Sequence, residues 1–93
     1  MSYSIIKGGI INFTRQSGSI YGKYGIRINT ICPGGVEDGK QEKNFLKNYK
    51  KKVPLKRLAK PSEIASVNLF LSSDASSYIT GTAVIVDGGW TCI

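Results

Sequence analysis

The chain has 93 residues, a length that allows one small domain and excludes a multidomain assembly. It contains no histidine, which excludes a Ser-His-Asp triad or a zinc–histidine site built from its own residues. No apolar run exceeds four residues, so we expect no membrane span. No basic-then-apolar leader precedes the first motif, and we therefore expect a cytoplasmic protein. In that compartment Cys32 and Cys92 are expected to be free thiols, with a disulfide as the alternative.

The first predicted element is a helix from Ser4 to about Tyr21. The residues of its predicted buried side recur at steps of three and four: Ile6, Ile10, Phe13, Ser17 and Ile20. Gly8 and Gly9 lower the helix propensity, and such a pair is usually tolerated where another backbone comes close. Gly22 and Gly25 are expected to end this helix.

A short β-branched strand is predicted over residues 26–32, because Pro33-Gly34-Gly35 follows it directly. A basic amphipathic helix is then expected from about Gln41 to Lys52, before Pro54. Pro61 and Glu63 are typical of a helix start and predict a further helix to about Ser72. Its buried residues are expected to be Ile64, Val67, Phe70 and Leu71.

The unalternated apolar run Ala83–Val86 predicts a second strand covered on both faces. Two strands joined by a long helical crossover are expected to be parallel. Parallel strands normally lie inside larger sheets, so a sheet of two would leave backbone edges and apolar faces uncovered. We therefore interpret residues 1–93 as one half of an α/β domain.

The formal net charge of +7 is local: residues 40–60 hold nine basic residues and one acid, Glu42. Such a run is either an anion-binding patch or a solvated helix face. Phe45 and Tyr49 stand among the lysines at helical spacing, as core anchors would, and nucleic-acid binding is therefore not favoured. Tyr78 and Trp90 are expected to pack, with contact to substrate or a neighbouring subunit as the alternative.

Tyr3 and Lys7 stand four positions apart, so they share one face of the first helix. An ammonium group close to a phenol favours the phenolate and lowers the phenol pKa by about 1–3 units from its usual value of about 10. The pair thus suits general acid–base chemistry. A helix-surface pair is the alternative for so short a pattern.

Other segments along the chain form a pattern together with this pair. Seven segments contribute to it: Tyr3-Ser4-Ile5-Ile6-Lys7, Gly25-Ile26-Arg27-Ile28-Asn29, Cys32-Pro33-Gly34, Pro54-Leu55-Lys56-Arg57-Leu58, Pro61-Ser62-Glu63-Ile64-Ala65, Tyr78-Ile79-Thr80-Gly81 and Val86-Asp87-Gly88-Gly89-Trp90. In this order and at these separations, the chain resembles the C-terminal part of the short-chain dehydrogenase/reductase family over essentially its whole length. The resemblance implies the C-terminal half of a Rossmann-like doubly wound parallel sheet, incomplete on its own, with residues 1–93 as a single fragment.

The resemblance also implies an activity, the NAD(P)-dependent interconversion of an alcohol and a carbonyl compound. Tyr3 matches the tyrosine that exchanges a proton with the substrate oxygen. Lys7 matches the lysine that lowers the tyrosine pKa and holds the nicotinamide ribose. Pro33 and Gly34 match the loop beside the nicotinamide ring, and Val36 matches the residue whose backbone meets the carboxamide. The implied cofactor is NAD or NADP, no metal is implied, and the implied partners are a small-molecule substrate and a second copy or a homologous chain.

The sequence departs from the family pattern at Asp38, where a threonine is usual, and at Gly8 and Gly9, where alanine is common. No Gly-x-Gly pair occurs, so we expect the pyrophosphate and adenosine sites to be absent and these residues alone to lack useful catalysis. Two other functions remain open. One is a non-catalytic module that docks on an intact homologue, and the other is polyanion binding through residues 40–60.

Overall fold

The computed structural model describes residues 2–92, with side chains from residue 4 onward. The main elements are three helices and two strands: α1 (Ser2–Tyr21), β1 (Thr30–Pro33), α2 (Lys43–Lys52), α3 (Pro61–Ser72) and β2 (Ala83–Val86). Short 3-10 turns follow α1, α3 and β2: η1 (Gly22–Tyr24), η2 (Asp74–Ser76) and η3 (Trp90–Cys92). The predicted order of helix, strand, two helices and strand is confirmed.

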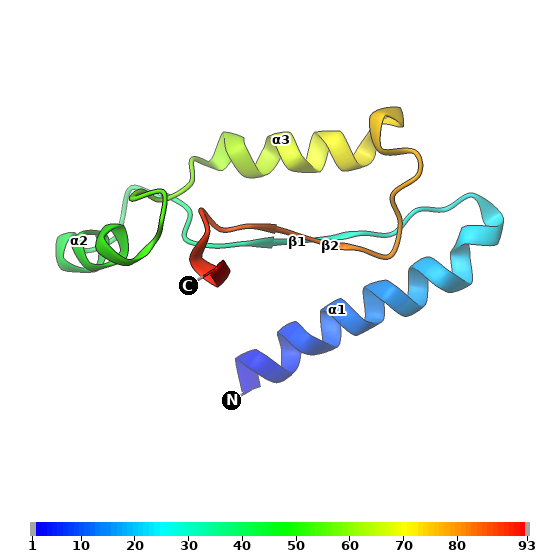
Figure 1. Cartoon of the computed structure of the whole chain (residues 1–93), viewed down its shortest axis with the longest axis horizontal. Helices are drawn as coiled ribbons and strands as arrows, with labels where there is room; N and C mark the ends of the chain where they lie inside the picture. Colours follow the sequence, from blue (N-terminus) through cyan, green and yellow to red (C-terminus); the bar gives the residue numbers. More distant parts are fainter. Residues whose placement is uncertain (1, 93) are drawn as a thin grey trace.

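The two strands are parallel, with Thr30 opposite Ala83 and Pro33 opposite Val86. Helix α3 lies over one face of the pair and α1 lies over the other, whereas α2 lies beyond the carboxyl ends of both strands (Figure 1). The predicted parallel pairing is therefore confirmed. The predicted cover of β2 on both faces is only partial, since Ile85 is 56% exposed. The carboxyl ends of the strands, the C-terminal turn and α2 meet at one end of the molecule, where the candidate site lies.

Strand β1 is shorter than the strand predicted over residues 26–32, because a side chain replaces the backbone ladder before Thr30. The Asn29 side-chain amide donates to the carbonyl of Ile79 (3.0 Å), and its oxygen accepts the N–H of Thr82 (3.1 Å). The Asn29 amide side chain thus joins the segment before β1 to the segment before β2. The regular ladder begins one residue later, where the Thr30 N–H donates to the Thr82 carbonyl.

The glycines of α1 behave differently from the sequence expectation. A Cβ added at Gly8 or Gly9 would meet nothing within 4 Å, so the expected close backbone at this pair is wrong. The close approach is at Gly18 instead, where a Cβ would lie 2.6 Å from the Cα of Gly81. The prediction that glycines end α1 is confirmed, since Gly25 adopts a φ of 74° and its N–H donates to the Gly22 carbonyl.

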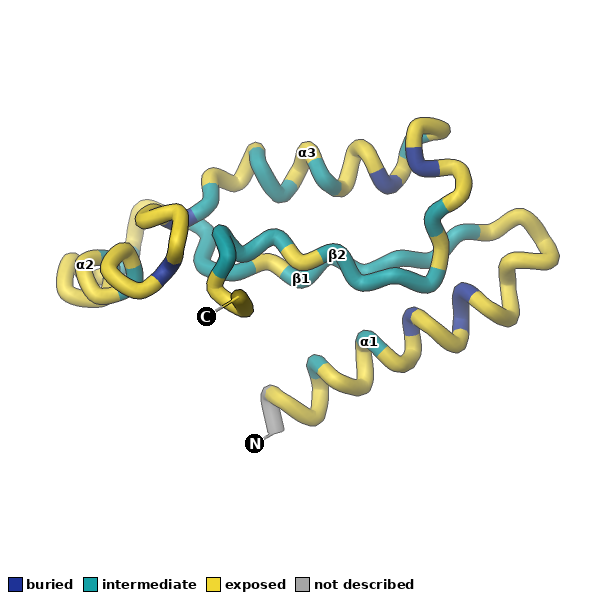
Figure 2. Tube along the Cα trace, viewed as in Figure 1, coloured by how far each residue is buried: buried dark blue, intermediate teal, exposed yellow. Residues whose placement is uncertain are grey.

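Small residues form the sheet-facing side of α1, and Ser17 is the member of the predicted stripe that is buried there. Thr14, Ser17 and Gly18 are buried, whereas the side chains of Ile6 and Phe13 are 61% and 67% exposed. Figure 2 shows the buried and half-buried positions of α1 on the side toward the strands, with the rest of the helix exposed. The periodicity therefore predicted the helix correctly but marked an outward-facing side of it.

The core of the described residues is small, and its fully or nearly buried hydrophobic side chains are Val53, Leu58 and Leu71. Of the other side chains expected to be buried in α3, Ile64 and Val67 are half-buried. Phe70 is 45% exposed, so the prediction of its burial is wrong. Its main-chain carbonyl accepts the hydroxyls of Ser73 and Ser76 (both 2.8 Å).

Candidate functional site

An open groove of about 510 Å³ lies at the carboxyl ends of the strands. Lys7 of α1 lines it together with Pro33 and Gly34, which follow directly from β1. The structure thus brings three of the predicted site residues to one place. Tyr3 belongs to the first turn of α1, but its side chain lies outside the described residues. Val36 does not line this groove and lies in the loop that follows Gly34 in the chain.

Backbone hydrogen bonds fix the loop that carries Val36. The Gly34 N–H donates to the carbonyl of Val86 (2.9 Å), which continues the sheet by one residue. Val36 then forms a parallel bridge with Ala59. In this bridge the Ala59 N–H donates to the Gly35 carbonyl (2.9 Å), and the Ala59 carbonyl accepts the Glu37 N–H (2.8 Å). The loop is therefore an extended and well-tied segment.

The Val36 peptide retains hydrogen-bonding capacity. Its carbonyl accepts the side-chain amide of Gln41 (2.7 Å), and a carbonyl oxygen has a second lone pair. Among the described residues nothing accepts the Val36 N–H. Val36 therefore offers one donor and one remaining acceptor, the two kinds of group that pair with the carbonyl and amino group of a primary carboxamide.

Asp38, which stands where the resembled family usually has threonine, folds its carboxylate back onto its own turn. Its Oδ1 accepts the N–H of Lys40 (2.7 Å), while its N–H donates to the side-chain oxygen of Gln41 (3.1 Å). This is an Asx-type turn, in which the carboxylate serves the local backbone. Asp38 also orients Gln41 toward the Val36 carbonyl.

Sequence reasoning missed the role of two aromatic residues in the groove. The phenol oxygen of Tyr49 accepts the N–H of Gly35 (2.7 Å), and its ring stacks on Trp90 with centroids 5.0 Å apart and planes 7° apart. Tyr49 is half-buried and Phe45 is 50% exposed, so neither is the core anchor expected from the helical spacing. Trp90 stacks on Tyr49 but is still 38% exposed, and Tyr78 is fully exposed, so the expected packing of Tyr78 is wrong.

Asp87 holds the C-terminal turn beside the same groove. Its carboxylate accepts the N–H of Gly89 (2.9 Å) and that of Thr91 (3.1 Å). Removal from solvent raises the pKa of Asp87, but hydrogen bonds from the Thr91 hydroxyl and from neighbouring backbone amides outweigh it and leave the pKa below its ordinary value. The ionised carboxylate thus fixes the turn that carries Trp90.

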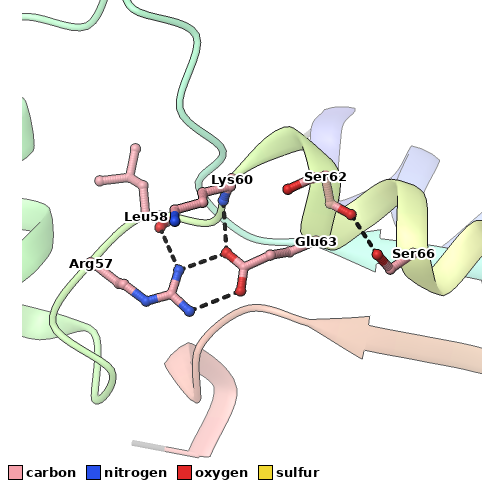
Figure 3. Close-up of polar contacts among 6 residues, drawn as sticks. All are labelled: Arg57, Leu58, Lys60, Ser62, Glu63 and Ser66. Carbon is pink, nitrogen blue, oxygen red and sulfur yellow. Dashed lines mark hydrogen bonds and ion pairs between the residues drawn. The ribbon is translucent and has the colours of Figure 1, made fainter.

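An ion pair ties α3 to the segment that supports Val36 (Figure 3). The Arg57 guanidinium makes two hydrogen bonds to the Glu63 carboxylate, at 2.6 and 2.8 Å, and Glu63 also accepts the Lys60 N–H (2.9 Å). The hydrogen bond from Arg57, followed by that from Lys60, lowers the pKa of Glu63 to about 2. The start of α3 is therefore fixed beside Ala59, the partner of Val36.

The described residues also bear on the expectations for metal ligands, membrane-spanning helices and cysteines. Residues 2–92 contain no group of three or more histidine, cysteine, aspartate or glutamate side chains arranged for a metal ion. None of the helices in the same range has the length and apolar character needed to cross a membrane. Cys32 is half-buried and Cys92 exposed, and both are free thiols, as predicted.

Known proteins similar to this chain agree on one family. A family model described as Enoyl-(Acyl carrier protein) reductase matches residues 1–91. The oxidoreductase UcpA of Escherichia coli O157:H7 is 38% identical over 97% of this chain and 38% of its own length. The 3-oxoacyl-[acyl-carrier-protein] reductase FabG of Chlamydia trachomatis is 45% identical over 95% of this chain and 37% of its own.

The solved structures give the same result. A short chain dehydrogenase family protein from Francisella tularensis superposes with a TM-score of 0.91 at 36% identity, over the whole of this chain and 44% of that protein. A short chain dehydrogenase from Bacillus anthracis gives a TM-score of 0.80 at 38% identity, over 91% of this chain and 33% of that protein. The chain spans about two fifths of the length of the curated relatives it matches. It therefore belongs to the short-chain dehydrogenase/reductase family and corresponds to a C-terminal part of such proteins.

Proposed function

We propose that this chain supplies the nicotinamide-facing part of an NAD(P)-dependent oxidoreductase that interconverts an alcohol and a carbonyl compound. The observation that carries the proposal is the groove in which Lys7 of α1 meets Pro33 and Gly34 at the end of β1. In open α/β sheets, ligands bind beyond the carboxyl ends of the strands, which is where this groove lies. Membership of an oxidoreductase family supports the same reaction class.

The residues at this end of the sheet fit a nicotinamide group. The N–H of Val36 has no acceptor among residues 2–92, and its carbonyl has a lone pair beyond the one that Gln41 occupies. Val36 can therefore hold a carboxamide from both sides, while Pro33 and Gly34 lie beside the ring. NAD or NADP supplies the hydride when bound, and the protein supplies placement and electrostatics.

For the proton we propose Tyr3 as the general acid and base, with Lys7 as its neighbour. The continuous helix from Ser2 onward maintains their four-residue spacing, which supports a shared face. The Lys7 ammonium would favour the ionised phenol and hold the ribose hydroxyls. Tyr3 would then take the proton from a small-molecule alcohol, or return it to the carbonyl oxygen.

We further propose that residues 1–93 by themselves lack useful catalysis. They contain no Gly-x-Gly pair, and a glycine-rich turn is what lets a backbone approach a pyrophosphate closely. The nicotinamide end alone offers only a part of the contacts that a dinucleotide needs. Pairing with a second copy or a homologous chain is a further prediction of the resemblance, and a cytoplasmic location stays a prediction from the sequence pattern.

A fusion experiment tests the proposal. The chain is joined behind the segment of UcpA that precedes the matched region, and reduced-nicotinamide absorbance is followed with NADH or NADPH and a panel of ketones. We expect turnover by the fusion, none by the chain alone, and loss of turnover in Tyr3→Phe. The matched control is Tyr24→Phe, since Tyr24 is 65% exposed in η1 and takes no part in the site. Turnover that persists in Tyr3→Phe contradicts the proposed role.

A second candidate function is docking on an intact homologue without catalysis. Large apolar side chains of α1 and α3 are exposed, among them Ile6, Phe13 and Leu69 at 61%, 67% and 73%. Apolar surface of this kind is typical of an interface. Co-elution with intact UcpA in size-exclusion chromatography, lost in Phe13→Glu, would support docking, and separate elution at all concentrations would exclude it.

A third candidate is polyanion binding by α2 and its flanks. No acid of the described residues forms an ion pair with the exposed lysines of this region: Lys40, Lys43, Lys47, Lys50, Lys51 and Lys52. Binding to heparin should then weaken steeply with salt, because each phosphate-like contact releases a counterion. A flat salt response would exclude this function.

A further inference from the structure

Tyr49 links helix α2 to the loop that would hold the nicotinamide. Its phenol oxygen accepts the Gly35 N–H at 2.7 Å, a short hydrogen bond between segments fourteen positions apart. A Cβ on Gly35 would lie 2.7 Å from the Cζ of Tyr49, so glycine is required for this approach of ring to backbone. The contact therefore depends on both residue types.

The orientation of the phenol is fixed from its other side. The Tyr49 ring stacks on Trp90, with planes 7° apart, and Trp90 is held in turn by Asp87, whose carbonyl accepts the Trp90 N–H (3.2 Å). Since Asp87 directly follows β2, a continuous series of contacts leads from the sheet through Trp90 and Tyr49 to Gly35. The phenol oxygen is thus placed by the sheet and is not a mobile surface group.

The Gly35 residue is held from two directions. Its N–H donates to Tyr49 and its carbonyl accepts the N–H of Ala59 (2.9 Å). The next peptide is that of Val36, whose N–H has no acceptor among the described residues. The Gly35 carbonyl and the Val36 N–H belong to one planar trans peptide and point in opposite directions. The Ala59 contact therefore holds the direction of the Val36 N–H, and the Tyr49 contact holds the preceding Gly34–Gly35 peptide.

We infer that Tyr49 is a positioning residue, which holds the Gly34–Gly35 peptide and thereby steadies the adjoining Val36 peptide, which would contact the carboxamide of the nicotinamide. The inference rests on the proposed function, since it deepens the description of the same site. Tyr49 acts through Gly35 and does not itself touch the reacting atoms. Loss of its oxygen should loosen the loop and weaken nicotinamide binding, while the stack on Trp90 remains.

The test uses the full chain labelled with ¹⁵N, and reduced nicotinamide mononucleotide as the probe. Tyr49→Phe removes the oxygen and keeps the ring, and Tyr78→Phe is the matched control at a fully exposed position. Amide exchange is measured at Gly35, with Gly34 as the internal reference because its N–H donates to Val86. The dissociation constant of the probe is measured from the shifts of the Val36 amide and the Trp90 indole N–H.

In Tyr49→Phe we expect exchange at Gly35 to accelerate about tenfold, with Gly34 and the free-state Trp90 resonance unchanged. The dissociation constant should rise about threefold to tenfold, the range of one net hydrogen bond. Tyr78→Phe should match the natural chain in both measurements. Unchanged Gly35 exchange, or an unchanged dissociation constant where the natural chain binds the probe, overturns the inference and leaves the proposed function standing. Absence of probe binding by the natural chain overturns the inference, and turnover by the UcpA fusion then decides the proposed function separately.

Discussion

Gly18 of α1 lies directly against the backbone of Gly81, so close that a Cβ on Gly18 would be 2.6 Å from the Gly81 Cα. Gly81 in turn donates its N–H to the carbonyl of Ile28 (2.7 Å), just before β1. This one contact therefore joins α1 to the segments that precede both strands. It sets the distance between the helix that carries Lys7 and the sheet that carries Pro33.

Replacement of this glycine should loosen α1. We predict that Gly18→Ala lowers the free energy of unfolding by about 1–3 kcal/mol, the usual range for an overpacked site. Gly8→Ala is the control in the same helix, and it should raise the free energy by about 1 kcal/mol because nothing lies within 4 Å of the added methyl group. Urea unfolding followed by circular dichroism measures both. Effects of the same sign would contradict the assigned contact.

Lys56 is the non-glycine residue with a positive φ among the described residues, at 59°. The left-handed region costs a residue with a Cβ about 1–2 kcal/mol, whereas glycine adopts it readily. Lys56 also donates from its Nζ to the exposed carbonyl of Lys51 (2.7 Å). We predict that Lys56→Gly is more stable than Lys56→Ala by about 1 kcal/mol, since both lose that hydrogen bond and only alanine retains the strain. Equal free energies of unfolding of the two variants in urea would contradict backbone strain at this position.

Glu63 should make the stability of the protein sensitive to acid. The pKa of Glu63 is lowered to about 2 in the folded chain. Its contribution to the free energy of unfolding is therefore fully present above the ordinary carboxyl pKa of about 4.3 and is lost as the pH falls toward 2. Glu63→Gln removes the charge and should abolish this part of the acid dependence. Thermal unfolding at pH 6 and pH 3 measures it. An identical loss of stability in both proteins would contradict the role of the Arg57–Glu63 pair.

Local signals predicted part of the fold well. Pro61 and Glu63 occupy the first turn of α3, and this helix begins and ends where the sequence indicated. The apolar run Ala83–Val86 gave β2 with the same bounds. The start of β1 was not predictable in this way, because the Asn29 side chain replaces the ladder through partners about fifty positions away.

Site residues that belong to a sequence motif were predicted, whereas site residues defined by contacts between distant segments were missed. Lys7, Pro33 and Gly34 were identified from the family pattern and line one groove. The contact of Tyr49 with Gly35 has no local signature, since an aromatic residue at helical spacing also fits a core position. The predicted stripe of α1 contained the buried Ser17, but the rest of the inner face was missed because small residues, not apolar ones, let this helix approach the sheet.

The central claim is that the phenol of Tyr3, made more acidic by Lys7, transfers the proton. The most direct test is the pH dependence of kcat/KM for alcohol oxidation by the fusion with the UcpA segment. The ionised phenol is the active form in this direction, so the rate should rise with pH through an apparent pKa about 1–3 units below the ordinary value of about 10. Lys7→Met should move this inflection upward, and Lys7→Arg, which retains the charge, should leave it near its original position. An inflection at the same pH in Lys7→Met would contradict the account.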